Sequence, residues 1–387
     1  MQRRSFILST AALAAGFSLS ACRPNNRPEL AVRFLDRSIP PRLLKEFRKQ
    51  RNQAVQLKFE SSDQLIALFD QLQQWKAQKT PPLPLWRRWL PKVNGAVDPP
   101  IKRADWLTLS DYWLTSAVRQ KLIQPIEMTD SPPWQDFPKE LRQLMRRNRE
   151  GELDSTAPIY GAPYRIQSLM LVYHRSLESQ GNWQPSLESL WLPEWQGRIA
   201  LPEDPQLLLG LVLKVLGHSI NQESAIADNQ VAKKFKALHQ QARVYDSSTY
   251  LKALINEDIS LAVGWSGDIL GALSRYPQLR AVFLPEGGIL SCDLWVRPDG
   301  AEPFAPNSIG QDWIDFCWDL QIATQITLSS RGFSPLFLGQ TTRPSALQTS
   351  QNLPSAKTLA NSEFLKPLSV KGKAAYQLLL EGLDDGA

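Results

Sequence analysis

The chain has 387 residues, a formal net charge of +6 and 43% hydrophobic residues, a composition typical of a globular protein long enough for two lobes. Its basic residues are scattered, which argues against nucleic-acid binding, and no apolar run reaches the roughly 20 residues of a membrane span. The three histidines show no metal-ligand spacing and no cofactor-binding motif occurs, so we expect neither a metal nor a cofactor.

The first expected element is an export signal. Arg3 and Arg4 precede a short apolar run that ends in small residues before Cys22, as in signal peptides. The four residues ending at Cys22 resemble the lipobox of bacterial lipoproteins, and the basic start resembles a twin-arginine signal. We therefore expect residues 1–21 to be removed, Cys22 to carry a lipid and residues 22–29 to form a spacer. An ordinary secretory signal with a chance cysteine is the alternative, and the export route stays open.

Strands and helices alternate after the spacer. Strands are expected at residues 30–35 and 55–59, each followed by a helix, and the first helix opens at Pro40. A Pro-rich and Trp-rich stretch at residues 76–104 then interrupts the pattern. We expect a surface insertion there, either passive or resting on a membrane or partner. A strand at 106–109 and a helix at 112–122 resume the order, which predicts an α/β fold.

Strands and helices are also expected to alternate in the second half of the chain. A turn at 160–164 and a strand at 169–173 are expected, and Gly217 is expected to end a buried helix. A continuous amphipathic pattern predicts one helix over 311–327. The remaining expected elements are helices at 207–217, 232–242, 247–254 and 372–383, strands at 261–264, 281–284 and 294–297, and a loop at 340–357.

Nothing in the sequence demands catalysis. The stretch from Gly264 to Asp268 is similar to a nucleophile motif around Ser266, but it lacks the second glycine of that motif and has no supporting triad. We therefore expect no enzyme, and keep an envelope hydrolase using Ser266 as an alternative. Cys292 and Cys317 stand among apolar residues and are expected to be buried thiols, although a disulfide between them stays open.

An ordered set of segments resembles the spermidine/putrescine-binding proteins of bacterial ABC importers, within the type II periplasmic solute-binding proteins. The segments are 39–47, 105–124, 160–173, 186–221, 262–272, 284–298 and 331–335. The resemblance implies two α/β lobes, each a mixed sheet flanked by helices, with a ligand cleft at a hinge where strands cross near 165–168 and 290–293. It implies an N-lobe of residues 30–167 plus 292–340, and a C-lobe of residues 168–291 plus 341–387.

The resemblance also implies ligand contacts. Members of the family hold a linear polyamine with carboxylates at its ammonium groups and aromatic faces along its methylenes, which offsets the desolvation of the cation. Asp293 interrupts an apolar stretch, so either a ligand contact or a structural ion pair is expected for it. The corresponding positions in this chain are Ser110, Tyr112, Asp204, Trp265, Asp293 and Phe333, with Asp36 and Arg165 as further candidates.

Some positions depart from the family's pattern. Ser291 stands where an aromatic is usual, and Leu207 stands where the longer-polyamine binders have an acid. Arg165 stands where an uncharged residue is usual. It could pair with Asp36 or Asp111, or it could receive a carboxylate of the ligand. The second case would favour a zwitterionic or anionic solute.

The resemblance therefore implies a non-enzymatic, monomeric solute-binding lipoprotein at the extracytoplasmic face of the membrane, anchored at Cys22. It would capture a polyamine such as putrescine or spermidine by hinge closure and deliver it to an ABC permease and its ATPase. The alternatives are a zwitterionic or anionic solute bound through Arg165, a hydrolase at Ser266, and a sensor or scaffold that uses the insertion at 76–104.

Overall fold

The structure, a computed structural model, describes residues 29–51, 55–77, 103–128, 131–179, 183–247, 249–302, 308–340, 343–348 and 350–384. The expected export signal, Cys22 and residues 78–102 of the expected insertion lie outside this part of the chain. Within it, no helix combines the length and the apolar content needed to cross a membrane.

The N-terminal third builds one side of a sheet. Strand β1 (Glu29–Leu35) alternates between half-buried and buried residues and lies parallel to β2 (Gln56–Ser62) and β3 (Trp106–Ser110). Pro41 occupies the first position of α1, where its missing N–H costs nothing. These strands and helices follow the expected order. The helices of this part are α1 (Pro41–Gln50), α2 (Leu65–Ala77), α3 (Asp111–Arg119), α4 (Pro132–Asp136) and α5 (Lys139–Leu144).

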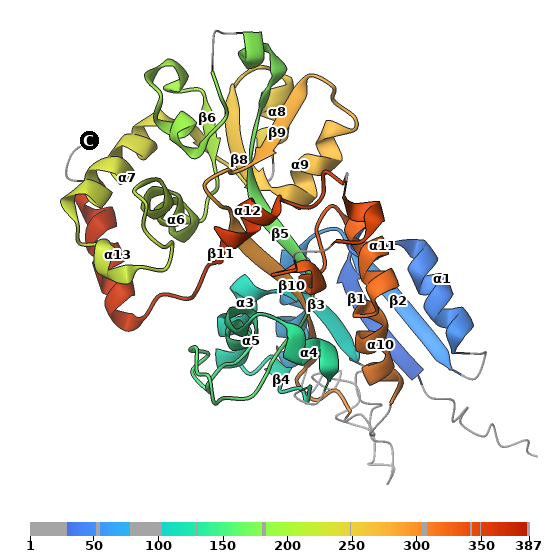
Figure 1. Ribbon diagram of the computed structural model, residues 1–387. Coiled ribbons are helices and arrows are strands. Elements are labelled where there is room, and N and C mark those ends of the chain that lie inside the picture. Colours follow the sequence, from blue (N-terminus) through green and yellow to red (C-terminus); the bar gives the residue numbers. More distant parts are fainter. Residues whose placement is uncertain are drawn as a thin grey trace, which may run out of the picture.

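Two long antiparallel strands, β5 (Ala162–His174) and β10 (Ile289–Pro298), run through both halves of the molecule (Figure 1). The strand order is β2-β1-β3-β10-β5-β8-β6-β7, and β9 (Leu279–Phe283) also pairs with β5. The other strands are β4 (Ile123–Gln124), β6 (Ile199–Leu201), β7 (Ala242–Tyr245), β8 (Leu261–Trp265) and β11 (Glu363–Phe364). Parallel and antiparallel pairs both occur, so the sheet is mixed.

The turn expected at residues 160–164 is largely strand. β5 begins at Ala162, and the pairing register shifts where Arg165 faces Asp293 while Pro163 faces Leu294. Tyr164 is therefore the extra residue of a β-bulge. Because the bulge interrupts the ladder, it accommodates a proline, which has no N–H to donate.

The expected helix over 311–327 is two helices, α10 (Ile309–Cys317) and α11 (Leu320–Ser330). The break falls at Asp319, whose carboxylate accepts hydrogen bonds from the backbone N–H groups of Gln321 and Ile322 and so starts a new helix. The hydrophobic pattern continues across the break because both helices pack against the same core.

The remaining helices cover the second half of the sheet. α6 (Pro205–Val215) starts at the cap Asp204, and Gly217, with φ of 78°, ends it in the left-handed conformation that was expected. The expected loop at 340–357 holds the start of α12 (Ala356–Ala360). The other helices are α7 (Asn229–Gln241), α8 (Tyr250–Ile255), α9 (Ser266–Leu273) and α13 (Val370–Asp384).

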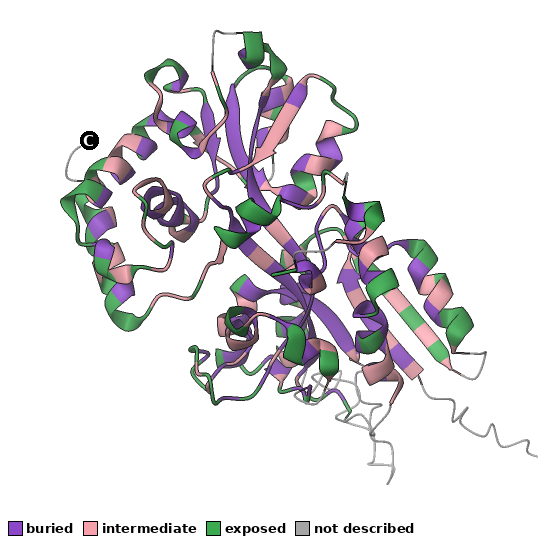
Figure 2. Cartoon of the chain, in the orientation of Figure 1, coloured by how far each residue is buried: buried purple, intermediate pink, exposed green. Residues whose placement is uncertain are grey.

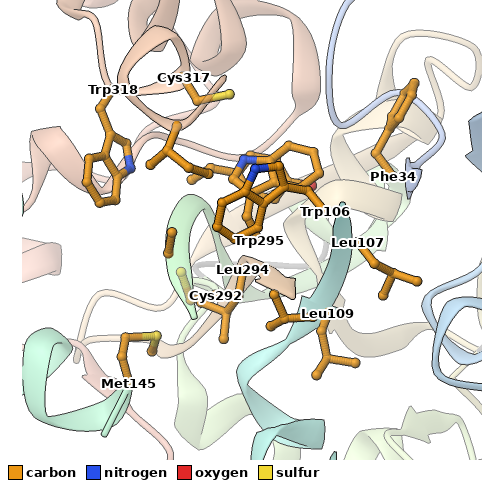
Figure 3. Packing of buried hydrophobic residues seen from close by; sticks show 14 of the residues in the cluster. Phe34, Trp106, Leu107, Leu109, Met145, Cys292, Leu294, Trp295, Cys317 and Trp318 are labelled. Atoms are coloured by element: carbon orange, nitrogen blue, oxygen red, sulfur yellow. The ribbon is translucent and has the colours of Figure 1, made fainter. Parts of the chain in front are cut away.

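Buried apolar residues form one large cluster and two smaller ones. Figure 2 marks the buried residues along the chain, and Figure 3 shows part of the large cluster. The large cluster draws on residues up to Ile166 and again from Leu290 to Leu359, and we call the elements around it the first lobe. The other two clusters draw on Leu169 to Ile289 and on α13, and define the second lobe. The chain thus returns to the second lobe after Phe364, later than the expected residue 341.

Candidate functional site

A cleft of about 830 Å³ lies between the two lobes. The first lobe contributes residues along α3, and the second contributes the start of α6 and the end of β8. Residues of β5 and β10 form its floor. Its central lining residues are Ser110, Asp111, Tyr112, Asp204, Trp265 and Ser291.

Asp111 is the most strongly held acid of the cleft. The backbone N–H groups of Tyr112 and Cys292 donate to its Oδ1 atom over 3.0 and 3.1 Å. The hydroxyls of Ser291 and Ser110 donate to the same oxygen over 2.7 and 3.2 Å. Among the described residues no donor engages Oδ2. Asp111 is thus fixed by its first oxygen and can offer the second to a cation.

Burial also changes the acidity of Asp111. Its side chain is taken out of water, which raises the pKa of the carboxyl to about 6, while the four hydrogen bonds partly oppose that rise. The buried guanidinium of Arg147 interacts electrostatically with this carboxylate, and its own burial lowers the pKa of Arg147 to about 10. Asp111 is therefore ionised at neutral pH and becomes neutral in mildly acidic solution.

Asp204 and Tyr112 face each other across the cleft. The Asp204 carboxylate caps α6, accepting the backbone N–H groups of Gln206 and Leu207 over 2.7 and 3.3 Å. Tyr112 lies in the first turn of α3, in the opposite lobe, and is 55% exposed. Burial of the phenol and the neighbouring Asp204 carboxylate raise the pKa of Tyr112 to about 12. This pair is a direct contact between the lobes.

Trp265 supplies an aromatic face at the end of β8. A Cβ at the preceding Gly264 would lie 2.1 Å from the hydroxyl of Tyr250, so only glycine fits there. This close approach brings the end of β8 against α8 and sets where Trp265 enters the cleft. A half-buried indole of this kind can hold an ammonium group against its face.

The cleft carries charges of both signs. Glu203 joins Asp111 and Asp204 as a third acidic lining residue, and the basic lining residues are Arg119, Lys366 and Lys373. The acids lie at the N-terminal ends of α3 and α6. Lys366 lies in the segment before α13, and Lys373 lies in the first turn of that helix (Figure 1). α3 carries charges of both signs, Asp111 at its start and Arg119 at its end, whereas Lys366 and Lys373 come from another part of the chain.

Four predicted contact residues are not among the lining residues of this cleft: Asp293, Arg165, Phe333 and Asp36. Asp293 nevertheless interacts with the side chain of Gln167, which does line it. Arg165 donates from Nε to Asp293 Oδ2 over 2.6 Å, and both side chains are buried. Burial raises the pKa of the Asp293 carboxyl and the guanidinium opposes that rise. Arg165 therefore pairs neither with Asp36 nor with Asp111. Phe333 is buried beside Ile166, and Asp36 forms a surface ion pair with Arg37 at 3.3 Å.

The structure does not support two of the alternatives, a hydrolase at Ser266 and a disulfide between Cys292 and Cys317. Ser266 is 1% exposed, and its hydroxyl accepts the backbone N–H of Ser168 over 3.3 Å. Cys292 and Cys317 are buried, free thiols. In the part of the chain described here, no three His, Cys, Asp or Glu residues are grouped so that they could hold a metal ion.

The sequence analysis named both neighbours of Asp111 but not Asp111 as a ligand contact. Its local sequence, Ser110-Asp111-Tyr112, is that of an ordinary helix start. What distinguishes the residue is the approach of Ser291 and Cys292, which are 180 and 181 positions away. The sequence alone does not indicate that Ser291 and Cys292 lie next to Asp111.

Comparison with known proteins places these features in a family. The chain is 28% identical to the putrescine/cadaverine-binding protein of Pseudomonas aeruginosa over 57% of its own length and 65% of that protein. It is 21% identical to the spermidine/putrescine-binding periplasmic protein of Escherichia coli over 92% of both chains. The chain thus spans slightly less than two thirds of the length of the first of these relatives.

The fold has close counterparts as well. The spermidine/putrescine ABC transporter substrate-binding protein of Streptococcus pneumoniae matches with a TM-score of 0.66 and 18% identity, over 92% of this chain and 99% of that one. This likeness confirms the predicted two-lobe α/β fold. Residues 104–359 match the family of bacterial extracellular solute-binding proteins. The chain therefore belongs to the bacterial extracellular solute-binding protein family, as a solute-binding protein and not an enzyme.

Proposed function

We propose that the protein captures a small cationic solute, a polyamine such as putrescine or spermidine, in the cleft between its lobes. One observation carries the proposal: carboxylates from facing helices, Asp111 and Asp204, line the same cleft as the aromatic rings of Tyr112 and Trp265. An ammonium group loses hydration on binding, and a carboxylate or an aromatic face offsets that loss. The names of the Pseudomonas and Escherichia relatives support the same ligand class.

Ligand binding would stabilise the closed arrangement of the lobes. Asp111 belongs to the first lobe and Asp204 to the second, so a ligand with two ammonium groups can pair with both only when the lobes are together. A ligand shifts a hinge equilibrium by its difference in affinity for the two states. The paired strands β5 and β10 connect the lobes and supply the hinge.

The proposal extends to the place of action. Attached by a lipid at Cys22, the protein would work at the extracytoplasmic face of the membrane as a monomer and pass its ligand to an ABC permease and its ATPase. The likeness to the Streptococcus transporter component supports this assignment. Mass spectrometry of the native membrane protein tests the anchor, since a diacylated N-terminal Cys22 is expected.

Thermal unfolding of the purified protein tests the ligand class. Putrescine, spermidine, acidic amino acids and ω-amino acids would each be added in large excess. A ligand at about 100 times its dissociation constant adds roughly 2.7 kcal/mol to the free energy of unfolding. The proposal expects stabilisation by the polyamines alone.

A zwitterionic solute is the second candidate, favoured by Lys366 and Lys373 in the cleft lining. Arg165 cannot serve it, because its guanidinium is buried and donates to Asp293 and to the carbonyl of Ser330. The candidate predicts that 4-aminobutyrate stabilises the protein more than putrescine does, and that Lys373→Gln removes this stabilisation.

A further inference from the structure

A second cavity of about 480 Å³ lies at the junction of the lobes, bounded by α5, the segment 337–340, α12 and β11. In Figure 1, β11 and α12 lie between the body of the second lobe and helices α3 and α5 of the first. The inner wall of the cavity consists of buried apolar residues: Leu141, Leu144, Leu290, Phe337 and Leu359. Its rim consists of exposed residues, which are Glu140, Gly339, Gln340, Ala356, Ala360 and Lys366. The second cavity therefore opens to solvent and has the volume of a small-molecule site.

The second cavity is separate from the ligand cleft. Successive strand residues point to opposite faces of a sheet, and the hydroxyl of Ser291 holds Asp111 on the face of the cleft. The side chain of Leu290, the preceding residue, therefore points to the other face, where Leu290 is paired in register with Phe364 of β11. The hydrogen-bonded strands β10 and β11 stand between the two chambers, so a molecule in the second cavity is a different molecule from the one in the cleft.

Two polar lining residues of the second cavity, Asn221 and Glu363, are already bound within the protein. The Asn221 side chain donates to the carbonyl of Phe364 over 3.0 Å and accepts the backbone N–H of Lys366 over 2.8 Å. The Glu363 carboxylate accepts the ammonium of Lys214 over 3.2 Å. A molecule entering the cavity would therefore gain mainly by burying apolar surface, and a charge on it would find no partner at the inner wall.

The two walls of the second cavity belong to different lobes. On one side, α5 and Leu359 pack in the apolar cluster of the first lobe. On the other side, residues 362–366 are tied to the second lobe, because the Gln206 side chain donates to the carbonyl of Lys366 over 2.8 Å. Gln206 lies in the first turn of α6, whose cap is the cleft residue Asp204. A molecule in the cavity would thus contact both lobes.

We infer that the second cavity binds a small, uncharged apolar molecule whose presence strengthens ligand binding in the cleft. The cavity has its present size in an arrangement in which Tyr112 and Asp204 of the two lobes meet across the cleft. A molecule that fits the cavity therefore favours this arrangement over an open one, as the ligand of the cleft does. Each of the two molecules should strengthen binding of the other, because such coupling is reciprocal. The coupling rests on the proposed function, whereas the apolar site itself does not.

Fluorescence titration with prodan, an uncharged naphthalene dye whose emission shifts to the blue in apolar surroundings, tests the inference. We expect saturable binding that saturating putrescine tightens by about fivefold or more. Ala356→Trp and Ala360→Trp would each fill the mouth of the cavity from its rim, and each should weaken prodan binding by about tenfold or more. Ala227→Trp, at an exposed position outside both linings, is the matched control and should bind prodan as the parent does.

Hydrogen exchange locates the bound dye. Because the dye would contact both walls of the second cavity, it should slow amide exchange in α5 of the first lobe and in residues 362–366 on the opposite side. Protection of both segments is the result expected for a molecule that bridges the lobes.

Three results would overturn the inference. If prodan does not bind, or binds equally to the parent and to both rim variants, the second cavity is not its site. If the dye protects only one wall, it does not bridge the lobes. If putrescine binds but leaves the affinity for prodan unchanged, the second cavity does not act on the cleft. An absence of putrescine binding would instead refute the proposed function and the coupling with it, while the apolar site would stand on the dye and the rim variants.

Discussion

Arg165 and Asp293 face each other across the paired strands β5 and β10, with the guanidinium Nε 2.6 Å from the carboxylate Oδ2. Both side chains are almost fully buried at the point where the strands pass between the lobes. Removing one partner leaves the other charge buried and uncompensated. The pair therefore holds the hinge strands together, and neither side chain is among the lining residues of the cleft.

The first prediction concerns this pair. Asp293→Asn should lower the free energy of unfolding by about 3–5 kcal/mol, measured by urea denaturation, with little change in ligand affinity. Glu60→Gln is the control, because the Arg33–Glu60 pair lies at the surface at 2.5 Å and should be worth at most about 1 kcal/mol. Equal stability of the two variants would contradict the assigned role.

The second prediction concerns pH. The pKa of Asp111 is about 6 in the folded protein, and only the ionised carboxylate pairs with an ammonium group. Affinity for putrescine should therefore fall as pH is lowered through 6, by about tenfold at one unit below that value. Calorimetric titrations between pH 5 and 8 measure this, and Asp111→Asn should remove the dependence.

The same pKa sets the sign of a stability effect. Folding raises the pKa of Asp111 above its ordinary value of 3.8, so the folded state binds the proton more tightly than the unfolded state. The contribution of Asp111 to stability should therefore be greatest below pH 4 and decline as pH rises towards 6. Comparing denaturant unfolding of the parent and Asp111→Asn over this range isolates the contribution, and a stability of the parent relative to Asp111→Asn that stays constant or increases as pH rises would contradict the assignment.

The third prediction separates two roles of Asp204. The carboxylate caps α6 and also lines the cleft. Asp204→Asn keeps a capping oxygen but removes the charge, so ligand affinity should fall with little loss of stability. Asp204→Ala should add a loss of about 0.5–2 kcal/mol in the free energy of unfolding. If Asp204→Asn binds a polyamine as the parent does, the residue is a cap alone.

The fourth prediction concerns the contact between Tyr112 and Asp204. Tyr112→Phe removes the phenol hydroxyl that meets the carboxylate of the other lobe. The ligand-free protein should shift towards the open arrangement by about 0.5–1.5 kcal/mol, seen as a larger radius of gyration in solution scattering. Saturating ligand should restore the radius of the parent. An unchanged ligand-free radius would show that the contact does not bias the hinge.

Much of the architecture could be predicted because it rests on local patterns. The alternation in β1, the proline opening α1 and the glycine ending α6 all express backbone preferences within a few residues. The bulge at Tyr164 could not be predicted in this way. It depends on the register against β10, set by residues about 130 positions later.

The residues of the candidate site likewise fall into those that the local sequence marks and those that only long-range packing brings to the cleft. Tyr112, Asp204 and Trp265 lie at element ends that the sequence marks, and the structure brings them to one cleft. Asp111 and the lysines at 366 and 373 become lining residues through long-range packing. Asp293 was recognised as a costly buried acid, but its partner Arg165 lies on another strand and only the fold reveals the pair.

The most direct test of the central claim is a calorimetric titration of putrescine into the parent protein, Asp111→Asn and Asp204→Asn at pH 7.5. The account predicts a single binding event in the parent that weakens by tenfold or more, about 1.4 kcal/mol, in each variant. Both variants should unfold cooperatively, so that weaker binding reports the lost charge. Putrescine binding that is unchanged in both variants would contradict the account, as would an absence of binding in the parent.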